Sequence, residues 1–256
     1  AQAKLRFRSR VLLVPSLFWN TMLEMYKIHM LGILIVVLFR TSAAGPSVVV
    51  ALAGGSGAGK SYIGTYVKKV FGHANVSILS HDRYYKDQAH LHPEERARLN
   101  FDHPDMLESS LMLEHIQGLQ RGETVDVPVY DFQTHSRLGY QQITPAPLVL
   151  VDGILVLAET VLSQAFDIRI YVDTPADIRL LRRIKRDLVE RGRSVESVLQ
   201  QYQDTVRPMH ELFVESSKAR ADVIVSGTEG ERFEPLVTLL AARTGLVRSS
   251  LVKDEL

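Results

Sequence analysis

From residue 47 onward, short runs of apolar residues alternate with amphipathic stretches. The runs occupy residues 47–53, 76–80, 148–152, 168–172 and 223–226 and are mostly β-branched. Continuous apolar runs of this length are typical of strands buried on both faces of a parallel sheet. Because helical patterns separate them, the order predicts an α/β fold whose parallel strands are joined by right-handed crossovers.

Two of the intervening segments show helical periodicity. The first follows the run at 47–53, places Ile63, Val67 and Val70 on one face and stops at Gly72. The second begins at Thr174-Pro175, with proline expected at the first helical position. Its apolar stripe consists of Ile178, Leu181, Ile184 and Leu188.

Residues 121–147 depart from this alternation. The segment contains prolines at 128, 145 and 147 and has valines at the alternate positions 125, 127 and 129. Alternation with a period of two predicts extended strands, and proline disfavours a place inside a central sheet. We therefore expect a hairpin or extended insertion outside the main sheet.

The first 40 residues differ in composition from the rest. They carry six Lys and Arg residues against a single acid, Glu24, and contain two apolar stretches, 11–19 and 31–39. Both stretches are shorter than the roughly 20 residues that span a bilayer, and the second resembles a signal-peptide core. We expect residues 1–44 to be an extension, disordered or targeting-like, residues 45–246 to form the main domain and residues 247–256 a tail. No stable membrane insertion is expected.

Composition excludes several classes of protein. The 256 residues are 46% apolar and include 30 Lys plus Arg against 29 Asp plus Glu, so the formal net charge is +1. This balance is ordinary for a globular domain, and a charge near zero argues against a nucleic-acid partner. The chain has no cysteine, which excludes disulfides, thiolate zinc sites and thiol nucleophiles.

The strongest chemical motif comes directly after the first apolar run. Its residues are Gly54, Gly55, Ser56, Gly57, Ala58, Gly59, Lys60 and Ser61, which fit G-x-x-x-x-G-K-[ST] between a strand and a helix. Glycines let backbone N–H groups surround a phosphate, and the helix N-terminus adds the positive end of its dipole. Lys60 is expected to reach the β- and γ-phosphates of ATP, and the Ser61 hydroxyl to bind Mg²⁺.

Two acids follow other buried strands. Asp152 ends the run at 148–152 and is predicted to be the second metal ligand, although a strand-ending Asp can also cap a loop. Asp82 follows the run at 76–80. Ligands bind at the carboxyl ends of parallel strands, so Asp82 would face the crevice of the P-loop and accept the proton of an attacking hydroxyl. Its other interpretation is a solvated turn residue.

A series of motifs resembles the uridine kinase (uridine-cytidine kinase) family of P-loop kinases. The motifs are GGSGAGKS (54–61), SHDRYYKD (80–87), NFDHPD (100–105), VPVYDFQTHSR (127–137), VDGIL (151–155) and DTPADIRLLRRIKRDLVERGRS (173–194). Their order and spacing agree from about residue 47 to about residue 228. One position departs from the family, which commonly has Glu where this chain has Asp152. The shorter Asp can still hold Mg²⁺, directly or through water.

This resemblance implies both a fold and an activity. The fold is NMP-kinase-like: a parallel five-stranded sheet flanked by helices, a β-hairpin insertion that binds the nucleoside and an Arg-rich helical lid. The activity is ATP-dependent phosphorylation of the 5′-hydroxyl of uridine or cytidine in pyrimidine salvage, with Mg²⁺ as the metal and usually a homotetramer as the assembly. It also implies that Asp82 is the general base.

The family resemblance assigns a set of nucleoside-binding residues. They are Tyr85, Phe101, Asp102, Tyr130, Phe132, His135, Arg186 and Gln201. A carboxylate such as Asp102 can accept hydrogen bonds from two vicinal ribose hydroxyls. Tyr130, Phe132 and His135 would form a flat slot with a polar edge for a pyrimidine. Without the family, the two aromatic residues would be read as core and the histidine as structural.

Residues 177–193 carry seven Lys and Arg residues against three acids, a local net charge of +4. Arg179, Arg182, Arg183 and Arg186 recur at helical spacing and form one basic face opposite the apolar stripe. A charge run is usually a solvated helix face, but in a phosphotransferase arginines can close over a triphosphate. The resemblance selects Arg183, Arg186, Arg191 and Arg193 as the lid arginines.

The sequence also leaves two other functions and two locations to consider. A phosphoribulokinase- or pantothenate kinase-like enzyme would share the P-loop but lacks the NFDHPD and VYDFQTHSR pair. A non-catalytic nucleotide-binding regulator is disfavoured because every catalytic position holds a competent residue. The terminal Lys253-Asp254-Glu255-Leu256 and the signal-like segment 31–44 permit the lumen of the endoplasmic reticulum. We expect the cytoplasm, where a salvage kinase finds ATP and nucleosides.

Overall fold

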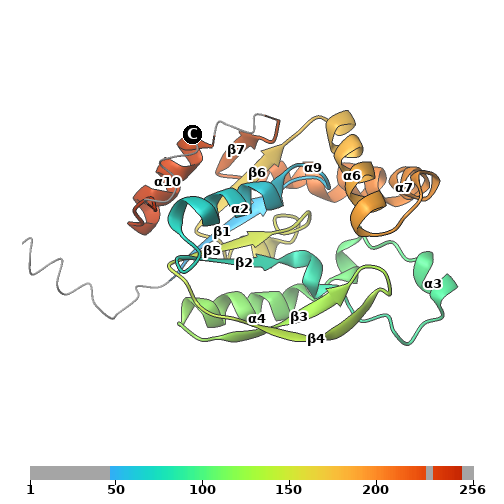
Figure 1. Cartoon of the computed structure of the whole chain (residues 1–256), viewed down its shortest axis with the longest axis horizontal. Helices are drawn as coiled ribbons and strands as arrows, with labels where there is room; N and C mark the ends of the chain where they lie inside the picture. Colours follow the sequence, from blue (N-terminus) through green and yellow to red (C-terminus); the bar gives the residue numbers. More distant parts are fainter. Residues whose placement is uncertain (1–46, 229–232, 250–256) are drawn as a thin grey trace, which may run out of the picture. The chain divides into compact units, whose positions relative to one another are not determined.

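Among the described residues, the main sheet of the protein has five parallel strands. The computed structural model describes residues 47–228 and 233–249, and within them the strand order is β2-β5-β1-β6-β7 (Figure 1). The strands are β1 (Val48–Ala53), β2 (Val76–Ser80), β5 (Leu148–Asp152), β6 (Ile168–Asp173) and β7 (Val223–Ser226). This confirms the predicted α/β fold with a parallel five-stranded sheet.

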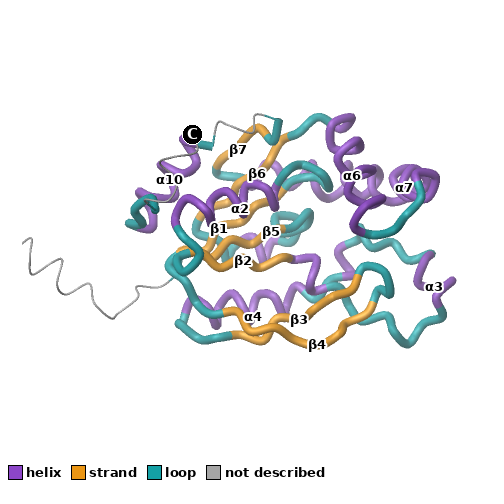
Figure 2. Tube along the Cα trace, in the orientation of Figure 1, coloured by secondary structure: helices purple, strands orange, loops and turns teal. Residues whose placement is uncertain are grey.

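Helices cover both faces of the sheet (Figure 2). On one face, α2 (Lys60–Phe71) and α10 (Glu234–Thr244) share an apolar cluster with Val50 and Leu52 of β1. On the other, α4 (Ser109–Gln120) and α5 (Thr160–Ser163) share a cluster with Val49 and Ala51. Alternate residues of β1 therefore serve opposite layers, which explains why its sequence is apolar throughout.

A separate hairpin carries the segment that stood apart in the sequence. Strands β3 (Val125–Asp131) and β4 (Ser136–Ile143) pair antiparallel in a two-stranded sheet of their own. In Figure 1 the hairpin runs beside α4, and Val125 and Val127 are buried in the cluster that α4 shares. The expected insertion is thus a hairpin, anchored by its alternating valines.

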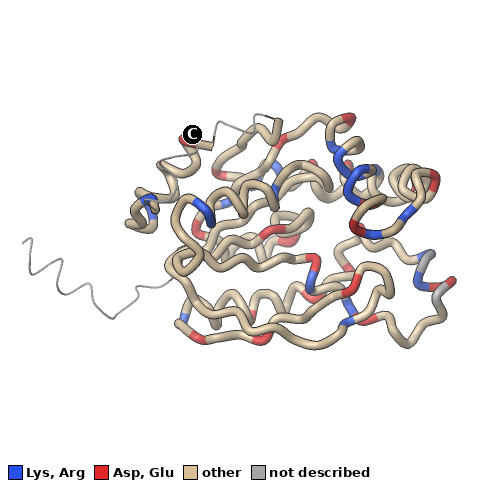
Figure 3. The backbone as a smooth tube through the Cα atoms, viewed as in Figure 1, with Lys and Arg blue, Asp and Glu red and all other residues tan. Residues whose placement is uncertain are grey.

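The helix α6 (Ala176–Glu190) packs through its basic face and not through the apolar stripe identified in the sequence. In its apolar stripe Leu181 is 60% exposed and Leu188 39%, whereas Arg179 and Arg183 are buried. The helix lies against the polar P-loop rather than against the sheet, so its basic face is the packed one; Figure 3 shows this concentration of Lys and Arg. Pro175 caps the helix instead of occupying its first position.

The chain after α6 forms an irregular helical stretch. It comprises α7 (Val195–Gln201), a π-helical segment (Tyr202–Val206), α8 (Arg207–Met209), a second π-helical segment (His210–Val214) and α9 (Glu215–Ser217). A further short helix, α3 (Pro93–Ala97), lies between β2 and α4. Segments of π-helix are rare and frequently occur at functional sites.

Several expectations concern residues beyond these ranges. The extension 1–44, with its signal-like segment, and the terminal residues 250–256 lie outside the described residues. In the described part of the tail, the Ser249 backbone N–H donates to the carbonyl of Val70 at 2.7 Å. Among the residues that the structure describes, no helix is both long and apolar enough to cross a bilayer.

Candidate active site

The P-loop joins β1 to α2 and is packed tightly against the start of the lid. Gly57 has φ +80°, and a Cβ built there would lie 2.3 Å from the carbonyl oxygen of Arg179. Gly54 has φ +139°, and its Cβ would lie 2.5 Å from the carbonyl oxygen of Val172. Glycine is required at both positions for its backbone conformation and for the close approach of a second backbone.

Lys60, Ser61 and Asp152 form a compact polar group at the first turn of α2. Ser61 Oγ donates to Asp152 Oδ2 at 2.7 Å, and Lys60 Nζ donates to the carbonyl of Gly55 at 3.1 Å. Burial lowers the pKa of Lys60, an effect opposed by Asp152 and Asp82. Burial likewise raises the pKa of Asp152, against the influence of Lys60 and the Ser61 hydrogen bond. The group thus offers a cation and two oxygen ligands beside the phosphate loop.

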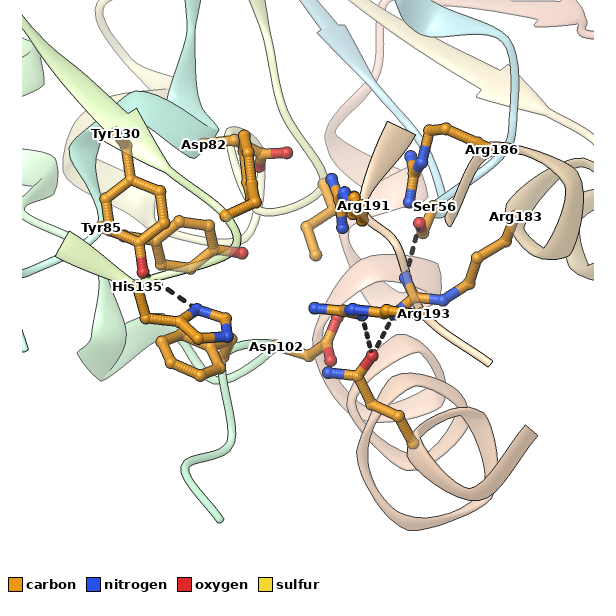
Figure 4. A pocket seen from close by; sticks show the side chains of 14 residues that line it. Ser56, Asp82, Tyr85, Asp102, Tyr130, His135, Arg183, Arg186, Arg191 and Arg193 are labelled. Carbon is orange, nitrogen blue, oxygen red and sulfur yellow. Dashed lines mark hydrogen bonds between the residues drawn. The ribbon is translucent and has the colours of Figure 1, made fainter. Parts of the chain in front are cut away.

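Asp82 lies on a 3₁₀ turn, His81–Tyr84, that directly follows β2. It is partly exposed and lines the cavity described below (Figure 4). Arg137 of the hairpin supports this turn: its Nε donates to the carbonyl of Tyr85 at 2.9 Å, and its Nη1 pairs with Glu108 at 2.7 Å. Arg137 is not among the residues that line the cavity, so its contacts with this turn are supporting ones.

Aromatic rings form one wall of the cavity. Tyr85 and Tyr130 have ring centroids 5.2 Å apart, and Phe101 stacks on His135 at 4.1 Å and 12°. Tyr130 Oη and His135 Nδ1 are 3.3 Å apart. Burial, reinforced by Arg193 and Arg191, lowers the pKa of His135 to about 4. The imidazole is therefore neutral at neutral pH and can present both a donor and an acceptor.

His135 also has an uncommon backbone. Its φ is +52°, and it is the one residue other than glycine with a positive φ among those described. The residue occupies the turn between β3 and β4. Left-handed conformations of other residues are strained and cluster at functional sites, where surrounding contacts enforce them. The hairpin turn thus presents the imidazole to Phe101 at a conformational cost.

Asp102 is a buried carboxylate, 6% exposed, at the same end of the cavity. Thr205 Oγ1 donates to Asp102 Oδ2 at 3.1 Å. Burial raises the pKa of Asp102, and Arg183 and the Thr205 hydrogen bond oppose that rise. Thr205 belongs to the first π-helical segment and was not selected from the sequence. The one feature of the sequence that could have indicated Thr205 is its spacing of four residues from Gln201, which places both on one face of a helix.

The lid arginines span the cavity from the P-loop to the aromatic end. Arg183 Nη1 donates to Ser56 Oγ at 2.9 Å, and its Nη2 donates to Gln201 Oε1 at 2.7 Å. The Cζ of Arg191 lies 4.3 Å from the ring centroid of Phe132, a cation–π contact between lid and hairpin. Arg183 thus connects Ser56 of the P-loop to Gln201.

One cavity brings most of the selected residues together (Figure 4). Its lining residues are Ser56, Asp82, Tyr85, Phe101, Asp102, Tyr130, Phe132, His135, Ile154, Arg183, Arg186, Arg191, Arg193 and Gln201. In Figure 4 the labelled arginines lie opposite Asp82, Tyr85 and Tyr130. Lys60, Ser61 and Asp152 are not among the lining residues. Ile154 was missed from the sequence, where an apolar residue after a strand carries no chemical signal.

The cavity is small, about 50 Å³, whereas ligand pockets usually enclose roughly 300–1,000 Å³. A second cavity of about 550 Å³ shares Phe101, His135, Arg193 and Gln201 with it. The stacked Phe101–His135 pair therefore contributes to the walls of both spaces. The inner space is smaller than the pockets that usually hold small ligands, and its neighbour is larger.

Comparisons with known proteins give a consistent picture. Residues 49–231 match the family described as "Phosphoribulokinase / Uridine kinase family". The chain is 47% identical over 197 residues to a uridine kinase of Chloroflexus aggregans, covering 77% of this chain and 93% of that relative. It is 43% identical over 202 residues to a uridine kinase of Brevibacillus brevis, covering 78% and 94%.

A solved structure extends the comparison to the fold. The phosphoribulokinase from Rhodobacter spheroides superposes with a TM-score of 0.53 at 10% identity, covering 72% of this chain and 71% of that one. At this identity the likeness concerns the arrangement of strands and helices alone.

Proposed function

The chain belongs to the phosphoribulokinase/uridine kinase family, and we propose that it transfers the γ-phosphate of ATP to the 5′-hydroxyl of uridine and cytidine. Identity of 47% with a uridine kinase favours a nucleoside acceptor. The phosphoribulokinase from Rhodobacter spheroides shares 10% sequence identity with this chain, so its likeness concerns the fold and not the acceptor. A non-catalytic regulator is disfavoured because Lys60, Asp82 and Asp152 are all present in chemically competent positions.

One observation carries the proposal: Ser56 of the P-loop, Asp82 and the aromatic nucleoside-side residues line the same cavity. A hydroxyl held between the aromatic wall and the P-loop would lie beside a carboxylate able to accept its proton. The arginines on the opposite wall would meet the charge on the transferred phosphoryl group. Proximity of acceptor, base and phosphate-binding groups is what phosphoryl transfer requires.

The donor would be MgATP. Ser61 Oγ and Asp152 supply two hard oxygen ligands within hydrogen-bond distance of each other. No group of three His, Cys, Asp or Glu residues able to hold a metal occurs in the described part of the chain. The oxygens of Ser61 and Asp152 fit Mg²⁺, which protein sites usually bind through one or two ligands together with substrate phosphates and water. Bound there, Mg²⁺ would neutralise charge on the phosphate oxygens.

The activity is tested by ADP release with MgATP against uridine, cytidine, adenosine, ribulose 5-phosphate and pantothenate. We expect release with uridine and cytidine and product mass corresponding to the nucleoside monophosphate. Preference for ribulose 5-phosphate or pantothenate would assign a different acceptor. Tight ATP binding without turnover of any acceptor would instead support a non-catalytic regulator.

Sugar recognition is assigned to Asp102. Replacement of Asp102 by Asn should raise KM for uridine by at least about tenfold. The substitution replaces one acceptor oxygen of the buried carboxylate by an NH₂ donor, which cannot accept a hydrogen bond from a ribose hydroxyl. The affinity for ATP should change little. The exposed Asp105, three residues away, provides the matched Asp105→Asn control. Equal use of uridine and 2′-deoxyuridine by the parent enzyme would contradict this role.

Three further assignments are proposals carried over from the sequence. They are a homotetramer, a kinase domain at residues 45–246 and a cytoplasmic location. The location can be tested at the sequon Asn75-Val76-Ser77, where the Asn75 side-chain amide donates to the carbonyl of Phe71 at 2.8 Å. A glycan at Asn75 would overturn the cytoplasmic assignment.

A further inference from the structure

Asp187 is the most buried acid of the lid, with a side chain that is 0% exposed. Its oxygens meet four guanidinium groups. The contacts are Arg186 Nε and Nη2 at 2.9 and 2.8 Å, Arg193 Nη1 at 3.2 Å, and Arg183 Nε and Arg191 Nε at 3.7 Å. These are the same four arginines that line the cavity. One carboxylate therefore touches every arginine of the proposed phosphate-facing wall.

The charges of this cluster depend on one another. Burial alone would raise the pKa of Asp187, but Arg186, Arg183 and Arg191 together lower it, so the carboxylate stays charged. The negative charge of Asp187 lies among the four positive guanidinium groups and reduces their mutual repulsion at short range. The cluster keeps an excess of positive charge for an anionic ligand while its members stay close together.

The backbone shows how two separate segments meet at this residue. Helix α6 ends at Glu190, and Gly192, with φ +62°, lets the chain reverse. The Arg193 backbone N–H then donates to the carbonyl of Asp187 at 3.1 Å. Asp187 thus holds the returning segment with its main chain and its side chain, which brings Arg193 alongside the arginines of α6.

The arginines also retain unused hydrogen-bonding capacity. Among the described residues, the buried Nε of Arg183 makes no hydrogen bond, and it lies 3.7 Å from Asp187 Oδ2. Asp187 therefore arranges these guanidinium groups without satisfying all of their donors. Donors that are fixed in place and not fully satisfied are suited to a ligand rich in acceptor oxygens, such as a triphosphate.

We propose that Asp187 is a positioning residue for phosphoryl transfer, holding Arg183, Arg186, Arg191 and Arg193 in the arrangement that meets the transferred phosphoryl group. This inference rests on the proposed kinase function. Asp187 does not line the cavity itself. Its effect on the reaction is exerted through the arginines, which it both gathers and orients.

The test compares catalysis with anion binding in the full-length chain. Asp187→Asn should lower kcat for uridine phosphorylation by at least about tenfold, because small displacements of preorganised groups are costly to phosphoryl transfer. Its affinity for inorganic tripolyphosphate, measured by calorimetry, should stay equal or become tighter, since the cluster loses a negative charge. Asp177→Asn removes an exposed carboxylate from the same helix and should change neither quantity.

A purely structural role would reduce kcat and tripolyphosphate affinity together, and that outcome would overturn the proposal. So would a folded Asp187→Asn variant with kcat within about threefold of the parent. If that variant does not fold, Asp187→Glu keeps the charge and displaces the carboxylate. Reduced kcat with retained tripolyphosphate affinity would then support the proposal, and unchanged kcat or failure to fold would reject it. Failure of the proposed function appears separately, as a parent chain inactive on every acceptor.

Discussion

Asp82→Asn should lower kcat by about 10²–10⁴-fold, the usual cost of losing a general base. The 5′-hydroxyl of a nucleoside is a poor nucleophile until its proton has an acceptor. Asp82 lines the cavity opposite the lid arginines. Its negative charge acts to raise the pKa of both Lys60 and Asp152. Asparagine keeps the shape and one acceptor oxygen but removes the charge. Affinities for uridine and ATP should therefore change little.

Rapid-quench measurement of the chemical step checks this prediction. The matched control is Asp87→Asn, which neutralises an exposed acid five residues along the chain, whose Oδ1 accepts from the Ala89 backbone N–H. Asp87 is also the next candidate for the base. If the Asp82 variant keeps more than about a tenth of parental kcat with chemistry rate-limiting, Asp82 is excluded as the base. A large loss in Asp87→Asn instead would transfer the role to that residue.

Lys60→Ala should reduce kcat/KM by about 10³-fold, because it removes the cation expected at the β- and γ-phosphates. Lys60 is 8% exposed and its ammonium is bonded to the carbonyl of Gly55, so it is already held in the phosphate loop. Uridine affinity should be nearly unaffected, because Lys60 is not among the residues that line the cavity proposed to bind the nucleoside. Steady-state kinetics and nucleoside titration separate the two effects.

Two further variants make this result specific. Lys60→Met retains most of the side-chain volume in the buried site and should lose activity as severely as alanine, which separates loss of charge from loss of packing. Lys69→Ala changes an exposed lysine at the far end of the same helix and should be active. Parental kcat/KM in Lys60→Met would refute the assignment of Lys60 to the phosphates.

Local chemistry in the sequence was enough to predict the strands and the phosphate loop. Apolar runs at 47–53 and 148–152 became β1 and β5 because a strand buried on both faces has no polar side to display. The strand–glycine–lysine–helix order of the P-loop is likewise contained in consecutive residues. The hairpin at 125–143 followed from its valine alternation and its prolines.

The face of α6 that packs could not be read from its pattern. Its apolar residues formed a regular stripe, yet Leu181 is exposed and Arg183 is buried. Periodicity reports which residues share a face of a helix, but not what that face meets. Here the neighbour is a polar loop whose Ser56 hydroxyl accepts a hydrogen bond from Arg183, so the packed face carries donors instead of apolar side chains.

Only the tertiary structure decided which distant segments of the chain come into contact. Ser61 and Asp152 are 91 residues apart in the chain and hydrogen-bonded in the fold, and Arg183 reaches Ser56 across 127 residues. The sequence determined which residue types were available and on which elements they lie. Only the folded chain decided that one buried carboxylate, Asp187, gathers four arginines, because that arrangement depends on the reversal at Gly192 and on the energy of burying opposite charges together.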